Sequence, residues 1–225
     1  MNTKGQKKIG LFGGTFDPIH FGHLRAAEEI KEILELDKVY FIPSGVPPHK
    51  TVSRITDAQK RLQMIRHAIE GNPYFDVSVF EIKRDTPSYT IHTLEYFIET
   101  VSDVELYFIL GNEQFNDIET WKDYLTLFKL SNFAVITRPG FSELDSCKVP
   151  LALKDEFRYY NSIENVISYS NKDKEIVFIE IKGIEISSTD IRNFVESNKS
   201  IKYLVPNKVE SYIKSKKLYT QEAPK

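Results

Sequence analysis

The sequence contains little cysteine, no long apolar run and almost no net charge, and each shortage excludes a class of protein. Cys147 is the only cysteine among 225 residues, so no intramolecular disulfide can form, which fits a reducing cytosol. No stretch approaches the roughly 18–20 uninterrupted apolar residues of a membrane span, and no apolar signal core follows the polar N-terminus. The formal net charge of −2 offers no basic field to nucleic acid or a membrane. We therefore predict a soluble, cytoplasmic protein, and a homo-oligomer is compatible with the sequence.

Two common nucleotide-binding signatures are also missing. The first glycine-rich turn, Gly10-Leu-Phe-Gly13-Gly14, does not have the G-x-G-x-x-G spacing of dinucleotide-binding folds. The segment from Gly45 to Thr51 ends in Lys-Thr but lacks the glycine that precedes the lysine in a P-loop. The sequence therefore gives little support to hydride transfer from a bound nicotinamide dinucleotide or to ATP hydrolysis of the P-loop type.

Short apolar runs alternate with amphipathic helical patterns along most of the chain. We expect strands near 9–12, 39–42, 75–80, 106–110, 133–136 and 176–181, and helices near 24–34, 57–70, 91–98 and 124–129. Ser187/Ser188 can cap a further helix and Pro206 can open a last one. The polar stretch 140–174 suggests only a helix near 154–160. This alternation predicts an α/β fold, a Rossmann-like doubly wound parallel sheet with a C-terminal helical extension.

The absence of repeats and long low-complexity linkers predicts one domain over residues 1–225, with a parallel core at about 8–184 and a helical part at about 185–218. Ligands of such sheets bind outside the carboxyl ends of the strands. Because Gly13, Ser44 and Gly111 each follow a predicted strand, their loops are expected to converge on one crevice.

The segment IGLFGGTFDPIHFGHL, residues 9–24, carries the strongest functional signal. Gly13 and Gly14 accept backbone angles closed to other residues, which predicts a tight turn that a ligand can approach. A helix start just beyond them presents unpaired N–H groups and the positive end of its dipole. His20 and His23, three positions apart, project from that first turn in the same direction. This arrangement is typical of a polyphosphate site.

Other interpretations of these side chains stay open. The two histidines can be a packed or capping pair, or they can share a metal ion, although no third Cys or His ligand lies nearby in the sequence. The run Pro47-Pro48-His49-Lys50 can be a stiff exposed loop or can hold Lys50 over the site. The run from Ser187 to Arg192 can be a helix cap, yet two serines, a threonine and an arginine exceed what a cap requires and suit polyphosphate.

The string GGTFDPIHFGHL resembles the nucleotidyltransferase superfamily, in which a glycine-rich turn is followed by H-x-G-H. The further motifs SGVPPHK (44–50), SYT (88–90), RPG (138–140) and ISSTDIR (186–192) are similar to those of the bacterial nicotinate-nucleotide adenylyltransferase family. The motifs follow the order of that family and span about residues 8–218.

The resemblance implies a role for each matched residue. His20, His23, Lys50 and Arg192 would be catalytic. The residues that would contact ATP are Gly13, Gly14, Thr15, Phe16, His20, His23, Gly111, Ser188, Thr189 and Arg192. Those that would contact the mononucleotide are Lys50, Thr86, Ser88, Tyr89, Thr90, Glu113, Trp121 and Arg138. Trp121, the only tryptophan, would stack on the pyridine, although a lone tryptophan can equally pack in a core. Glu113 and His92 depart from the family pattern, which has aspartate at both positions.

The implied reaction joins the phosphate of nicotinate mononucleotide to the α-phosphorus of ATP and releases pyrophosphate. No protein-bound metal is expected, because Mg²⁺ would be carried mainly by the ATP phosphates. Two alternatives stay open, a nucleotidyltransferase that acts on another phosphate ester and a non-catalytic nucleotide sensor.

Overall fold

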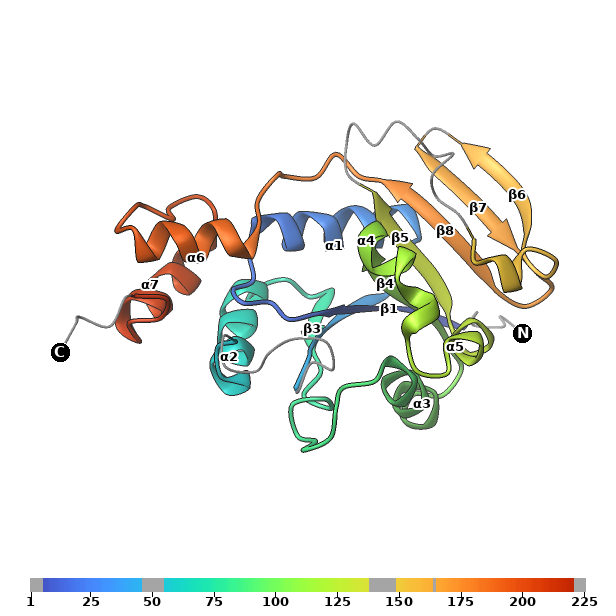
Figure 1. Ribbon diagram of the computed structural model, residues 1–225, viewed down its shortest axis with the longest axis horizontal. Helices are drawn as coiled ribbons and strands as arrows, with labels where there is room; N and C mark the ends of the chain where they lie inside the picture. Colours follow the sequence, from blue (N-terminus) through green and yellow to red (C-terminus); the bar gives the residue numbers. More distant parts are fainter. Residues whose placement is uncertain (1–5, 46–54, 138–148, 164, 221–225) are drawn as a thin grey trace.

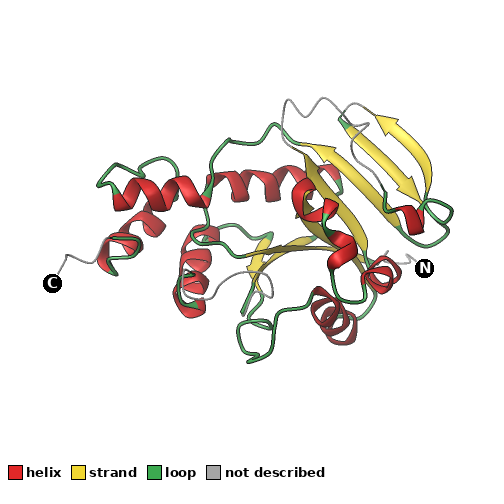
Figure 2. Ribbon diagram, viewed as in Figure 1, coloured by secondary structure: helices red, strands yellow, loops and turns green. Residues whose placement is uncertain are grey.

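The computed structural model describes residues 6–45, 55–137, 149–163 and 165–220. The expected sites Lys50 and Arg138 lie outside these ranges, as does His49. Figures 1 and 2 show a central twisted sheet with helices on both faces and a pair of helices at one end. Within the described residues no helix is long and apolar enough to cross a membrane.

In the part of the chain that the structure describes, eight strands form one sheet in the order β3-β2-β1-β4-β5-β8-β7-β6. The parallel part comprises β1 (Lys7–Gly14), β2 (Lys38–Pro43), β3 (Phe75–Val77), β4 (Val104–Gly111), β5 (Asn132–Thr137) and β8 (Glu175–Glu180). The chain builds outward from β1 to β3 and then crosses back to place β4 on the other side of β1. The switch point lies between β1 and β4, so the loops that follow these two strands border the predicted crevice.

The two faces of the sheet have separate apolar cores, because successive side chains of a strand point to opposite sides. Phe12 and Ile109 face one core, which is shared with α1 (Phe21–Ile33), α2 (Ala58–Ile69), α6 (Ser188–Glu196) and α7 (Asn207–Ser215). Leu11 and Phe108 face the other, which is shared with α3 (Thr90–Thr100), α4 (Asn112–Asn116) and α5 (Tyr124–Leu130). Two short 3-10 turns, Ile118–Thr120 and Leu151–Leu153, complete the second layer. The doubly wound prediction is confirmed.

The stretch after β5 corrects one expectation. Residues near 154–160 were predicted to be helical, but β6 (Arg158–Ile163) begins there and pairs antiparallel with β7 (Val166–Ser170). All six residues of β6 are exposed, since it is the outer strand of the sheet. An edge strand without a buried face lacks the apolar alternation from which strands are predicted. The strand expected over 75–80 is also shorter, because the chain turns after Val77.

The C-terminal helices lie far from this hairpin. Figure 1 shows α6 and α7 beside the start of α1 and beside α2, at the opposite end of the molecule from β6 and β7. Ile191 of α6 and Val209 of α7 are buried in the same core as Ile30 of α1 and Ile65 of α2. The last described segment of the chain therefore packs against the first helix, next to the H-x-G-H motif.

Candidate active site

The two histidines cap α1 reciprocally. The backbone N–H of His23 donates to Nδ1 of His20 over 3.3 Å, and the N–H of His20 donates to Nδ1 of His23 over 3.3 Å. The two rings stack with centroids 3.7 Å apart. The capping interpretation is therefore confirmed. It also directs each neutral ring's proton to Nε2, because Nδ1 serves as the acceptor.

A neutral imidazole is favoured at His23. Burial, followed by repulsion from the neighbouring His20, lowers the pKa of His23 well below its ordinary value. Two stacked rings cannot both carry charge at small cost when one of them is also desolvated. His23 thus offers an Nε2–H donor at the positive end of a 13-residue helix, which is suited to an anion.

This depressed pKa predicts how stability depends on pH. The unfolded chain binds a proton at His23 below about pH 6.5, whereas the folded chain resists it, so the free energy of unfolding decreases as the pH falls from that value, by up to about 1.4 kcal/mol per pH unit. Chemical denaturation of the native protein and of His23→Gln between pH 7.5 and 5 measures this. We expect a flatter profile for His23→Gln. Identical profiles for the native protein and His23→Gln would contradict the assignment.

The role of the two glycines differs from the prediction. Gly13 and Gly14 are the last residues of β1 and neither has a positive φ; the left-handed residue is Phe16, with φ of 51°. Glycine is required there by space. A Cβ on Gly13 would lie 2.9 Å from the ring of Phe108, and one on Gly14 would lie 2.9 Å from the ring of Phe16. Phe16 itself is held by edge-on contact with His23.

The C-terminal motif meets the turn that precedes α1. Ser188 Oγ donates to the carbonyl of Pro18 over 2.8 Å, and Arg192 Nη1 donates to the carbonyl of Asp17 over 2.7 Å. Ser187 caps α6 by accepting from the N–H of Asp190, so the cap interpretation also holds. Motifs 170 or more residues apart in the sequence therefore form one site.

Among the described residues, Arg192 forms two side-chain hydrogen bonds at this turn. Its Nη2 donates to Thr189 Oγ1 over 3.2 Å, and Nη1 donates to Asp17. A guanidinium carries five N–H donors in a planar fork. The two contacts orient the fork beside the H-x-G-H turn, and Thr189 adds an exposed hydroxyl at the start of α6.

The acceptor-side residues gather around the ends of β2 and β4. Ser88 Oγ accepts from the N–H of Gly45, which joins the SYT segment to the loop after β2. Lys122, next to Trp121, lies 5.0 Å from the ring centroid of Tyr89. Trp121 packs edge-on against Phe108 of β4, with ring centroids 6.0 Å apart, and stays partly exposed.

The remaining expected residues flank this cluster. Gly111 ends β4 and caps α4, and its N–H donates to Gln114 Oε1 over 3.0 Å. Glu113 is exposed in the first turn of α4. Thr86 is exposed before the SYT segment, and Thr90 begins α3.

Sequence reasoning missed a buried arginine at the centre of the site. Arg61 on α2 is 1% exposed, and its guanidinium donates to the carbonyls of Thr15 (2.8 Å), Ser44 (2.7 Å) and Thr56 (2.8 Å). One side chain thus joins the loop after β1, the loop after β2 and the start of α2. Arg61 stands four positions before Ile65 and eight before Ile69, which are buried apolar residues of the same helix. This spacing was the signal in the sequence that the arginine lies on the buried face of α2.

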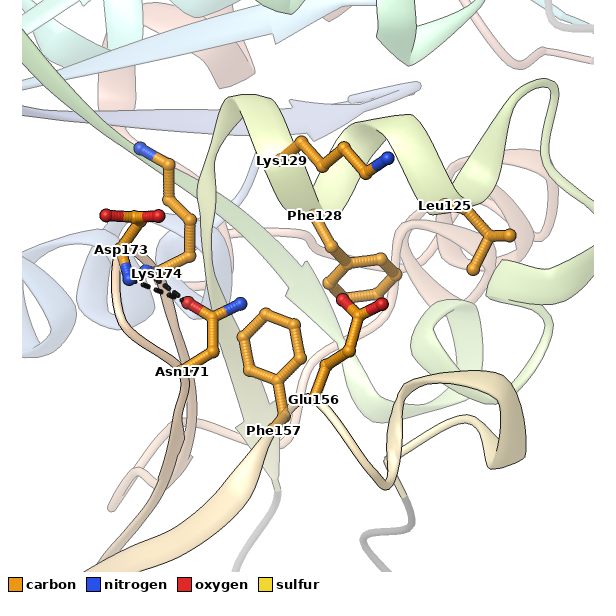
Figure 3. Close-up of a pocket in the computed structure, with 8 residues that line it drawn as sticks. All are labelled: Leu125, Phe128, Lys129, Glu156, Phe157, Asn171, Asp173 and Lys174. Atoms are coloured by element: carbon orange, nitrogen blue, oxygen red, sulfur yellow. Dashed lines mark hydrogen bonds between the residues drawn. The ribbon is translucent and has the colours of Figure 1, made fainter.

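A pocket of about 220 Å³ lies elsewhere and is not this site. Figure 3 shows it between α5 and the turn before β8, with Phe128 and Phe157 inside and Lys129 and Lys174 around it. These residues precede β5 and β8, so the pocket is at the amino-terminal edge of the sheet, whereas the histidines follow the carboxyl end of β1.

Fold, motif order and site geometry define a nucleotidyltransferase, and the cytidylyltransferase-like family matches residues 11–194. Probable nicotinate-nucleotide adenylyltransferases from Geotalea daltonii and Moorella thermoacetica are 40% and 43% identical, each over 94% of this chain and over 98% and 91% of their own lengths. The chain belongs to the nicotinate-nucleotide adenylyltransferase family.

Solved structures share the fold. The nicotinic acid mononucleotide adenylyltransferase of Plasmodium falciparum, in complex with NaAD, has a TM-score of 0.68 and 20% identity over 95% of this chain and 97% of its own. A putative nicotinate-nucleotide adenylyltransferase from Vibrio parahaemolyticus has a TM-score of 0.64 and 17% identity over 96% and 97%.

Proposed function

We propose that the chain is a single nucleotidyltransferase domain that transfers AMP from ATP to the phosphate of nicotinate mononucleotide and releases pyrophosphate. The family membership supports the reaction. The observation that carries the site is the docking of Ser188 and Arg192 on the turn before His20, which places a guanidinium and two imidazoles at one helix start.

The nucleophile needs no activation by the protein. A phosphate monoester has a second pKa near 6, so the acceptor is mostly a dianion at neutral pH. Its oxygen attacks the α-phosphorus, the bond to the β-phosphate bridging oxygen breaks, and pyrophosphate leaves with that electron pair. The protein aligns the two anions and stabilises the charge that develops on the phosphates.

The proposed hydrogen-bond donors come from different parts of the chain. His20 and His23 present Nε2–H groups at the start of α1, and Ser188, Thr189 and Arg192 add hydroxyls and a guanidinium from α6. Gly13, Gly14, Thr15, Phe16 and Gly111 would border the nucleotide through their backbone. Lys50 and Arg138 would contact the acceptor from segments outside the described residues, together with Thr86, Ser88, Tyr89, Thr90, Glu113 and Trp121.

Mg²⁺ is proposed to arrive with ATP. Among the described residues, no group of three or more His, Cys, Asp or Glu side chains is arranged to hold a metal ion. The site's donors are cationic, hydroxylic or N–H groups, which fit phosphate oxygens, and the phosphates themselves are good Mg²⁺ ligands. The ion would neutralise phosphate charge. Cytoplasmic location and homo-oligomerisation stay predictions.

A pyrophosphate-release assay tests the proposed reaction. The purified protein with Mg-ATP is given nicotinate mononucleotide, nicotinamide mononucleotide or phosphopantetheine, and the dinucleotide product is identified by chromatography. We expect release with nicotinate mononucleotide and formation of nicotinate adenine dinucleotide. Release only with phosphopantetheine would indicate another acceptor, and ATP binding without any release would indicate a nucleotide sensor.

A further inference from the structure

The turn that precedes α1 contains a buried carboxylate that the proposed chemistry does not use. Asp17 is 4% exposed. Its Oδ2 accepts from the N–H of Thr56 over 3.1 Å, and its Oδ1 accepts from the hydroxyl of Tyr219 over 2.6 Å. The backbone carbonyl of the same residue is the acceptor for Arg192. Asp17 is thus the point at which the turn is joined to the segment before α2, to α6 and to the segment after α7.

Tyr219 comes from the far end of the chain, 202 residues after Asp17. It follows α7 in a left-handed conformation, with φ of 62°, and its ring is half-buried. Burial, followed by the charge of Asp17 and their hydrogen bond, raises the pKa of the Tyr219 phenol. The hydroxyl therefore stays protonated at neutral pH and serves as the donor of this hydrogen bond.

The surroundings limit how the turn can move. Arg61 lies beside it and donates to the carbonyl of Thr15, two residues before Asp17. Burial lowers the pKa of the Arg61 guanidinium, and the charges of Asp17 and other nearby groups oppose that effect. Thr15 is thus fixed by Arg61 of α2, while Asp17 is fixed by Thr56 before α2, by Arg192 of α6 and by Tyr219. His20, the N-cap of α1, follows only three residues later.

We infer that Tyr219 is a positioning residue for ATP: through its hydrogen bond to the Asp17 carboxylate, it holds the turn that places His20 and Arg192 against the phosphates. The inference rests on the proposed function. The acceptor-side residues Ser88 and Trp121 lie on other loops and do not contact Asp17 or Tyr219, so we expect the loss of the bond to act mainly on ATP.

The direct test is Tyr219→Phe, which removes one oxygen atom and leaves the ring. We expect the Kd and KM for Mg-ATP to rise about tenfold, the size typical of losing one hydrogen bond to a charged group, while the KM for nicotinate mononucleotide stays within about twofold. Tyr212→Phe is the matched control, because its ring packs against His67 on α2. That variant should keep both constants.

A double-mutant cycle tests whether the effect passes through Asp17. Asp17→Asn weakens the acceptor, so adding Tyr219→Phe to it should cause little further loss of ATP affinity. Equal rises in both KM values, additive effects of the two substitutions, or a lower melting temperature with unchanged ATP affinity would overturn the inference. ATP affinity is measured by calorimetry, so failure of the proposed reaction, seen as no pyrophosphate release from the native protein, is distinguished from failure of this positioning role.

Discussion

Replacement of His23 by alanine is expected to lower kcat by about 100- to 1,000-fold, by analogy with the deletion of one oxyanion-hole donor. The substitution removes the Nε2–H that the reciprocal cap directs away from the helix. It also removes the acceptor for the His20 N–H, which costs helix stability. Pyrophosphate release at saturating ATP and acceptor measures the loss of turnover.

Glutamine at the same position separates the two roles of His23. His23→Gln keeps a side-chain acceptor for the cap, because a glutamine at N3 can accept from the backbone N–H of the N-cap residue in a capping box. We expect it to recover the melting temperature but not kcat. His67→Ala, a histidine of α2 that packs against Tyr212, serves as the control and should retain full turnover. Turnover of His23→Ala within tenfold of the native value would refute the phosphate role.

Replacement of Arg192 by alanine should also lower kcat/KM for ATP by about 100- to 1,000-fold, because it removes a charged donor next to the developing charge. The loss has two sources, since the guanidinium also anchors α6 to the Asp17 carbonyl over 2.7 Å. Steady-state kinetics with varied ATP, together with thermal unfolding, quantify both.

Lysine at position 192 distinguishes charge from geometry. Arg192→Lys keeps the positive charge but has no planar fork to bond the Asp17 carbonyl and a phosphate at once. We expect activity between those of the native and alanine proteins. Arg158→Ala, on the exposed edge strand β6, is the matched arginine control and should be neutral. An alanine variant at 192 with native kcat/KM would exclude the guanidinium from the site.

Local patterns predicted most of the sheet. The runs around Leu11, Phe41 and Phe108 form buried parallel strands as expected, because strands covered on both faces are continuously apolar. Strand β6 was mistaken for a helix because none of its side chains is buried. The periodicity of apolar residues indicates which face of an element is buried. It therefore cannot identify an edge strand whose side chains are all exposed.

The motifs indicated the candidate site, but not the contacts that hold its parts together. His20, His23, Ser188 and Arg192 could be chosen from sequence because their residue types suit phosphate. The reason for Gly13 and Gly14 could not, since it depends on the rings of Phe108 and Phe16 in the folded chain. Arg61 and Tyr219 bind backbone or carboxylate groups from remote segments, and such pairings exist only after tertiary packing.

The contact between Arg192 and the turn at Asp17 joins two parts of the candidate site that are synthesised at different times. These residues are 175 positions apart, so at a translation rate of roughly 5–20 residues per second the second part leaves the ribosome about 9–35 s after the first. A nascent chain that stops after β8 contains all the described strands but lacks the α6 residues Ser188, Thr189 and Arg192. We therefore expect an incomplete translation product to bind Mg-ATP more weakly than the full chain.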